Sequence, residues 1–140
     1  MNIQEIKRLE HITLKSDLDL LTFGEKFQKA LTLPAMARDY ENETEWLEID
    51  HHGINYNISR PYNPGTLQEW DDTTPEGCNF GIVLGIHNDH PHVLNNTWVD
   101  NMVANICRQL AKTFNTHVYH HRTFTFGIDK SERKNIVFNP

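Results

Sequence analysis

Residues 41–62, ENETEWLEIDHHGINYNISRPY, contain the clearest structural pattern in this chain of 140 residues. Apolar and polar residues alternate over residues 45–49 and again over residues 54–59. A two-residue period is typical of a strand that has one buried face and one face in water. Residues 50–53 lie between the two segments and end in a glycine, which adopts the positive φ that tight hairpin turns require. The stretch therefore predicts a β-hairpin.

Two helices are predicted from start signals that precede apolar stripes. Ser16 and Asp19 have the spacing of a capping box, and apolar side chains then recur every three or four residues until Pro34. These signals predict a helix over residues 17–31. Thr97 and Asp100 have the same spacing and precede a similar apolar stripe, which predicts a helix over residues 97–114.

Further strands are predicted outside the hairpin from alternation and from β-branched and aromatic residues. Gly81 and Gly85 alternate with the apolar residues of one such strand, and glycines there either allow another element to approach closely or mark bulges. Residues 61–77 are rich in proline and glycine and predict a long loop, and Leu67 and Trp70 within it indicate a packed loop and not a disordered one. The additional strands are predicted at residues 11–15, 78–87, 117–126 and 136–138.

The order of these elements predicts a single α+β domain over residues 1–140. We expect a mainly antiparallel sheet of four to five strands, with two helices packed on one face. The chain is long enough to bury a core without disulfides, and Cys78 and Cys107 are expected to be reduced. No run of 18 apolar residues occurs, and the N-terminal residues lack the apolar core of a secretory signal. We therefore expect a cytoplasmic protein that has no membrane segment.

The net charge of −6 is distributed unevenly along the chain. Residues 39–76 hold ten carboxylates and one base, Arg60, for a charge of −9, while the other residues hold nine carboxylates and twelve bases, for +3. Such an acidic sector repels phosphates, which argues against direct nucleic-acid binding. It suits a basic protein partner, because complementary fields speed association and disfavour wrong partners. A solvated face that only keeps the protein soluble is the alternative interpretation.

The nine histidines raise the question of a metal site. His87, His90 and His92 lie within six residues, and His120 lies on a later predicted strand, so a small metal-dependent hydrolase that uses these four residues is the alternative function. However, no standard zinc spacing, nucleophile elbow or phosphate-binding loop occurs. We therefore predict that the protein is not an enzyme and has no catalytic residues, no bound metal and no cofactor. A scaffold or ligand-binding subunit of a larger assembly is a further alternative.

Aromatic residues among the carboxylates predict a protein-binding surface, because tryptophan and tyrosine dominate interface hot spots while charges steer the approach. Packing of Trp46 and Trp70 in a second core beneath the 61–77 loop is the alternative for these two side chains. The predicted partner-binding residues are Glu43, Glu45, Trp46, Glu48, Asp50, Tyr62, Trp70, Asp71 and Asp72.

Several short motifs resemble those of small bacterial immunity proteins. The motifs are ENETEW at residues 41–46, ISRPY at 58–62, GTL at 65–67, WD at 70–71 and GCNFGI at 77–82. Over residues 41–84 the chain is similar to proteins that partner the toxic tips of contact-dependent growth inhibition and related polymorphic toxin systems. The resemblance implies a cytosolic, non-catalytic α/β protein that binds one cognate toxin domain and blocks its active site or the approach of its substrate. Such toxins are frequently nucleases with basic clefts, which agrees with the acidic sector.

Overall fold

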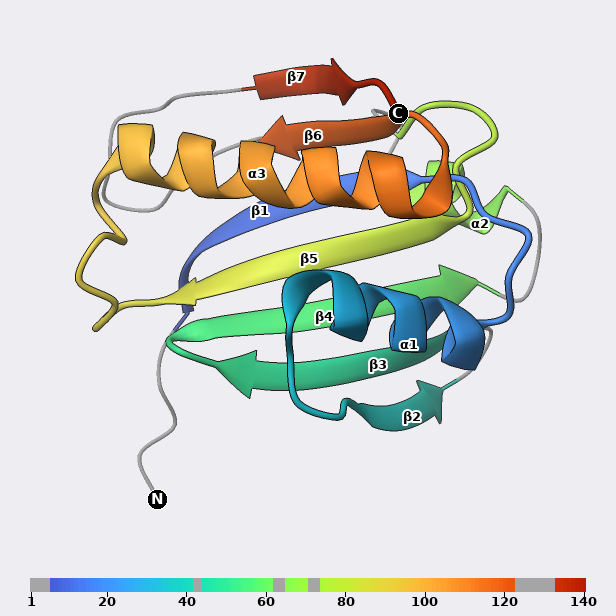
Figure 1. Ribbon diagram of the computed structural model, residues 1–140, viewed down its shortest axis with the longest axis horizontal. Helices are drawn as coiled ribbons and strands as arrows, with labels where there is room; N and C mark the ends of the chain where they lie inside the picture. Colours follow the sequence, from blue (N-terminus) through green and yellow to red (C-terminus); the bar gives the residue numbers. More distant parts are fainter. Residues whose placement is uncertain (1–5, 42–43, 62–64, 71–73, 123–132) are drawn as a thin grey trace.

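A seven-stranded antiparallel sheet organises the part of the chain that the computed structural model describes, residues 6–41, 44–61, 65–70, 74–122 and 133–140 (Figure 1). The order of strands across the sheet is β2-β3-β4-β5-β1-β6-β7. The strands are β1 (Ile6–Leu14), β2 (Ala37–Glu41), β3 (Thr44–His51), β4 (Ile54–Pro61), β5 (Phe80–His87), β6 (Val118–Arg122) and β7 (Arg133–Phe138).

Two long helices cover one face of this sheet. Helix α1 (Leu20–Leu31) lies over β3 and β4, and α3 (Asn96–Phe114) contacts β6 and β7 and passes in front of β1 and β6 in Figure 1. The Phe23 ring of α1 stacks on Phe80 of β5 and on Phe114 of α3, with ring centroids 4.0 and 4.2 Å apart. These contacts join both helices to the middle of the sheet, where burial of such rings is a principal source of stability.

Alternation along the strands gives the sheet two chemically different faces. The helix face contains the apolar core, including Ile12, Ile58 and Ile82, which are fully buried. We call the other side the open face. Its Gly81 lies against Leu67 of the short helix α2 (Thr66–Trp70). The open face is formed by the alternate positions of the strands, which include Asp39, Glu41, Trp46, Glu48, Asp50, Asn55, Asn57, Ser59, Gly81, Val83, Gly85, His11, Thr13, Tyr119 and His121.

The predicted α+β class is confirmed, but the predicted numbers of strands and helices are wrong. Strand β2 has all five residues exposed, so no alternation reveals it and no strand was predicted there. Strand β1 begins five residues before the predicted strand, because charged residues occupy its buried positions. Helix α2 lies inside the predicted 61–77 loop.

The two long helices α1 and α3 begin after the caps Asp19 and Asn95. The carboxylate oxygen of Asp19 accepts the amide of Thr22, and the amide oxygen of Asn95 accepts the amide of Trp98.

The predicted hairpin and the predicted role of the strand glycines are confirmed. Strands β3 and β4 pair from Thr44↔Pro61 to His51↔Ile54, and the turn between them places Gly53 at φ 78°. A Cβ atom at Gly85 would lie 2.8 Å from Cδ1 of Ile6, so a side chain there would force Ile6 to move. The missing side chain therefore permits the N-terminal part of β1 to pack closely.

The thiols also agree with the prediction, since Cys78 and Cys107 are buried and form no disulfide. In the described part of the chain, none of the helices has the length and apolar character needed to cross a membrane.

Gly24 of α1 provides a test of the contact between this helix and the sheet. Alanine normally stabilises a helix interior by about 1 kcal/mol relative to glycine. Here the added Cβ would overlap a δ-methyl group of Leu47 on β3, and overpacking of this kind costs about 1–3 kcal/mol. We expect Gly24→Ala to lower the free energy of unfolding, measured in urea, by about 1 kcal/mol.

The matched control for this prediction is Gln28→Ala on the same helix, which should change the stability by less than about 0.5 kcal/mol. In a Leu47→Ala background the Gly24→Ala substitution should become neutral or stabilising, because the overlapping methyl group is gone. A stabilising Gly24→Ala in the unaltered protein would contradict the proposed contact.

Candidate functional site

Four carboxylates gather on the open face of two neighbouring strands. Asp39 and Glu41 of β2 and Glu48 and Asp50 of β3 are all exposed, and we call them the acidic patch. The register pairs Ala37 with Glu48, and β2 and β3 lie about 4.8 Å apart, as neighbouring strands do. The patch therefore combines residues that are up to eleven positions apart in the sequence into one surface.

The arginines of these strands lie on the other face and do not neutralise the patch. Arg38 Nη2 donates to Glu45 Oε2 at 3.0 Å, and the Arg60 guanidinium lies 5.8 Å from the centre of the Phe80 ring in the core. Among the described residues of β2, β3 and β4, the open face therefore carries negative charge without lysine or arginine.

An amide and an imidazole hold two of the patch carboxylates in place. Asn55 Nδ2 donates to Glu48 Oε2 at 3.0 Å and to Asp50 Oδ1 at 3.2 Å. His87 Nε2 of β5 lies 2.9 Å from the same Asp50 oxygen, although the Asp50 side chain remains 66% exposed. An amide orients carboxylates without cancelling their charge, so Glu48 and Asp50 remain available to a cation.

The predicted partner-binding residues are brought together only in part. Trp46, Glu48 and Asp50 share the open face, and the structure adds Asp39 and Glu41 to them. In contrast, Glu45 lies on the helix face, where its side chain is 12% exposed and bound to Arg38. Trp70 is the last residue of α2. The remaining predicted residues, Glu43, Tyr62, Asp71 and Asp72, lie outside the described residues.

A cavity of about 400 Å³ opens on the same face, beside the acidic patch. Its walls come from β4, β5, β1 and β6 and from the segment around α2. The volume falls within the range of pockets that hold small ligands or large side chains, roughly 300–1,000 Å³. The cavity residues used below are His11, Thr13, Ser59, Leu67, Thr74, Gly81, Val83 and His121.

The four histidines of the hydrolase alternative do not converge. His87 binds Asp50, and His120 Nε2 lies 2.8 Å from Glu10 Oε1 on the helix face. His90 and His92 pack against Trp98 of α3, with ring centroids 4.9 and 4.7 Å from the indole. Burial and the neighbouring His92 lower the pKa of His90, whose Nδ1 already accepts the His92 amide.

Across the described ranges, no group of three or more His, Cys, Asp or Glu side chains has an arrangement that could hold a metal ion. The alternative in which His87, His90, His92 and His120 form one ligand set is therefore wrong. His87 and His120 lie on opposite faces of the sheet, and His90 and His92 pack together against α3, so closeness in sequence does not bring the four rings to one point.

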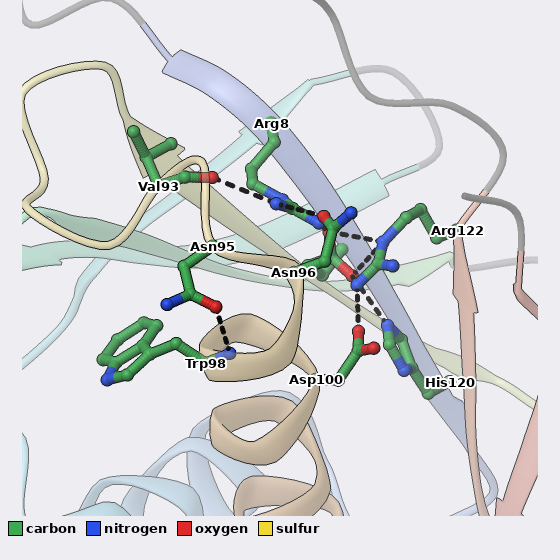
Figure 2. A network of polar contacts seen from close by, with 9 residues as sticks. Arg8, Val93, Asn95, Asn96, Trp98, Asp100, His120 and Arg122 are labelled. Atoms are coloured by element: carbon green, nitrogen blue, oxygen red, sulfur yellow. Dashed lines mark hydrogen bonds and ion pairs between the residues drawn. The ribbon is translucent and has the colours of Figure 1, made fainter. Parts of the chain in front are cut away.

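The densest polar cluster of the described residues lies between the sheet and the N-terminal part of α3 (Figure 2). Glu10 of β1 is fully buried and accepts Arg8 Nε at 3.2 Å and Arg122 Nε at 2.9 Å, in addition to its contact with His120. Arg122 Nη2 also donates to Asp100 Oδ1 of α3 at 2.6 Å. We call these five residues the Glu10 network.

Arg8 extends the network to the start of α3. Its Nη1 donates to the Val93 carbonyl and to Asn96 Oδ1, both at 3.0 Å (Figure 2). Because Arg8 and Arg122 are each 1% exposed, a substrate or partner cannot reach their charged groups, and we interpret the network as structural. The sequence contained one signal of it, the charged Arg8 and Glu10 at the same alternate positions as the buried Ile12 and Leu14.

Removal of the Glu10 charge should destabilise the fold strongly. Glu10→Gln leaves the buried guanidinium groups of Arg8 and Arg122 without their shared counter-charge. Breaking a buried ion pair in this way costs about 3–5 kcal/mol. We expect a loss of this size in the free energy of unfolding, measured in guanidinium chloride, whereas the exposed control Glu25→Gln on α1 should change it by less than about 0.5 kcal/mol. Equal effects of the two substitutions would rule out a structural role for the network.

The network also predicts how stability depends on pH. Burial opposes the ionisation of Glu10, but hydrogen bonds from His120 and Arg122 outweigh it and lower the pKa of Glu10 from 4.5 to about 2. Because the pKa is lower in the folded state, this contribution is fully present above about pH 4.5 and is lost as the pH falls toward 2. The difference corresponds to about 3 kcal/mol. Urea unfolding between pH 6 and pH 2 should show this loss, and Glu10→Gln should reduce the slope.

Comparisons with protein-family models, with curated proteins and with solved structures found no match for this chain.

Proposed function

We propose that this chain is a cytoplasmic immunity protein, which binds a cognate toxin domain through the open face of its sheet and thereby blocks the toxin. The observation that carries this proposal is the acidic patch, whose carboxylates share one exposed surface without a neutralising arginine or lysine on β2, β3 or β4. The motifs in residues 41–84 that resemble those of immunity proteins give a second, independent reason.

The charge of the patch favours a basic toxin. The patch carboxylates would repel a polyanion such as a nucleic acid. A positively charged cleft that binds phosphates would instead attract Asp39, Glu41, Glu48 and Asp50. Toxins that cleave nucleic acids need such a cleft. An acidic surface seated there occupies the positions of the phosphates and excludes the substrate.

The arrangement of the sheet suits a protein partner. Helices α1 and α3 anchor the sheet from the opposite side, so binding on the open face leaves the core undisturbed (Figure 1). Stable interfaces bury about 800 Å² on each partner, which is more than four side chains provide. Trp46 beside the patch and the neutral row Asn55, Asn57 and Ser59 on β4 extend the surface.

Charge reversal in the patch tests the proposal. The triple variant Asp39→Lys, Glu48→Lys, Asp50→Lys should lower the association rate constant with the cognate toxin domain by at least about tenfold at low salt. The rate constant of the unaltered protein should fall as salt is added, and that of the variant should not. Stopped-flow fluorescence measures both, and growth of cells that express the toxin reports protection.

The matched control is the triple variant Asp17→Lys, Glu25→Lys, Asp89→Lys, which makes the same change in net charge at exposed positions outside the patch. It should retain association and protection. Equal losses in both variants would show that only the net charge matters, and unchanged binding of the patch variant would refute the role of the acidic patch.

A further inference from the structure

The cavity on the open face lies within the area that a partner docked on the acidic patch would cover. One row of the sheet runs from Glu48 of β3 through Asn57 and Val83 to His11 of β1. Three strand spacings separate the first and last of these residues, about 14 Å. An interface of standard size is wider than this distance, so one partner would contact both the patch and the cavity.

The cavity is lined by flat, apolar and hydroxyl-bearing groups. Gly81 has no side chain and forms its floor, and a Cβ atom added there would lie 3.4 Å from Cδ1 of Leu67. Leu67 and Val83 supply apolar contacts. The rings of His11 and His121 stack with centroids 5.2 Å apart and an angle of 24° between their planes. Thr13, Ser59 and Thr74 add hydroxyl oxygens.

Arginine, tyrosine and tryptophan are the side chains most enriched at interface hot spots, and the lining of the cavity favours the aromatic ones over arginine. Among the described residues that line the cavity there is no carboxylate, so an arginine buried against them would lose water without gaining a counter-charge from them. An aromatic ring instead gains contact with Leu67 and Val83. The hydroxyl of a tyrosine or the N–H of a tryptophan finds a partner among the threonine and serine oxygens.

We propose that this cavity is an anchor pocket, which receives a tyrosine or tryptophan side chain from the same basic partner that the acidic patch attracts. The inference rests on the proposed function and assigns separate roles to two parts of one face. The patch governs the rate of association, and the pocket governs the rate of dissociation, because apolar contacts at an interface centre act mainly after docking.

The pocket can be tested on the isolated protein with N-acetyl-L-tryptophanamide as the probe. The probe should shift the backbone amide resonances of Thr13, Ser59 and Gly81 in two-dimensional NMR spectra, whereas N-acetyl-L-argininamide should not. Gly81→Val fills the cavity without a change in charge and should abolish the shifts. Absence of shifts with the tryptophan probe, or equal shifts with both probes, overturns the inference.

In the complex with the toxin domain, Gly81→Val should raise the dissociation rate constant by about thirtyfold, the effect of losing one hot-spot side chain, and should leave the association rate constant unchanged. If Gly81→Val does not fold, Ser59→Leu fills the same cavity from β4 and replaces it. Unchanged dissociation in a folded cavity-filling variant overturns the anchor pocket but leaves the proposed function standing. Failure of the unaltered protein to bind the toxin overturns the proposed function itself, whatever the probe shows.

Discussion

The buried carboxylate of Glu10 is the constraint on which the described fold depends most. A carboxylate removed from water costs several kcal/mol, and the cost is offset only where cations and donors converge on it. Here the donors come from Arg8 on its own strand and from His120 and Arg122 on β6. Arg122 and Arg8 then bind Asp100 and Asn96 of α3. An apolar cluster would tolerate a shifted strand or a rotated helix, whereas this network fits one register of β1 with β6 and one position of α3.

The network lies on the helix face, and this placement separates the residues that stabilise the fold from the proposed binding surface. The helix face holds the stacked Phe23, Phe80 and Phe114 rings and the Glu10 network, all enclosed by α1 and α3. The open face carries the acidic patch and the cavity. Because the two sets of side chains alternate along the same strands, the backbone that the core fixes also fixes the spacing of the surface groups. A binding surface built in this way is preorganised, which reduces the entropy lost on association.

Strand β2 shows how charge affects an exposed sheet edge. All five of its residues are exposed, and its outer edge offers unpaired backbone groups to any extended chain. On the open-face side of this edge Asp39 and Glu41 carry like charges, which oppose the same side of a second copy, while Arg38 lies on the helix-face side and binds Glu45. The same carboxylates therefore discourage self-association and support the proposed recognition.

The sequence by itself determined the hairpin, the core stripes of α1 and α3 and the glycine face of β5, because each depends on backbone periodicity over a few residues. The same two-residue period places Glu45 on one face with Leu47, so its position on the helix face was predictable. The count of charges along the chain did not take this period into account.

Tertiary structure alone decided the rest. Glu10 and Arg122 meet across 112 positions, and β2 has no pattern to reveal it. The cavity over Gly81 is formed by strands from both ends of the chain. Such contacts depend on which strands become neighbours in the sheet, and this is set by long-range packing that local spacing does not encode.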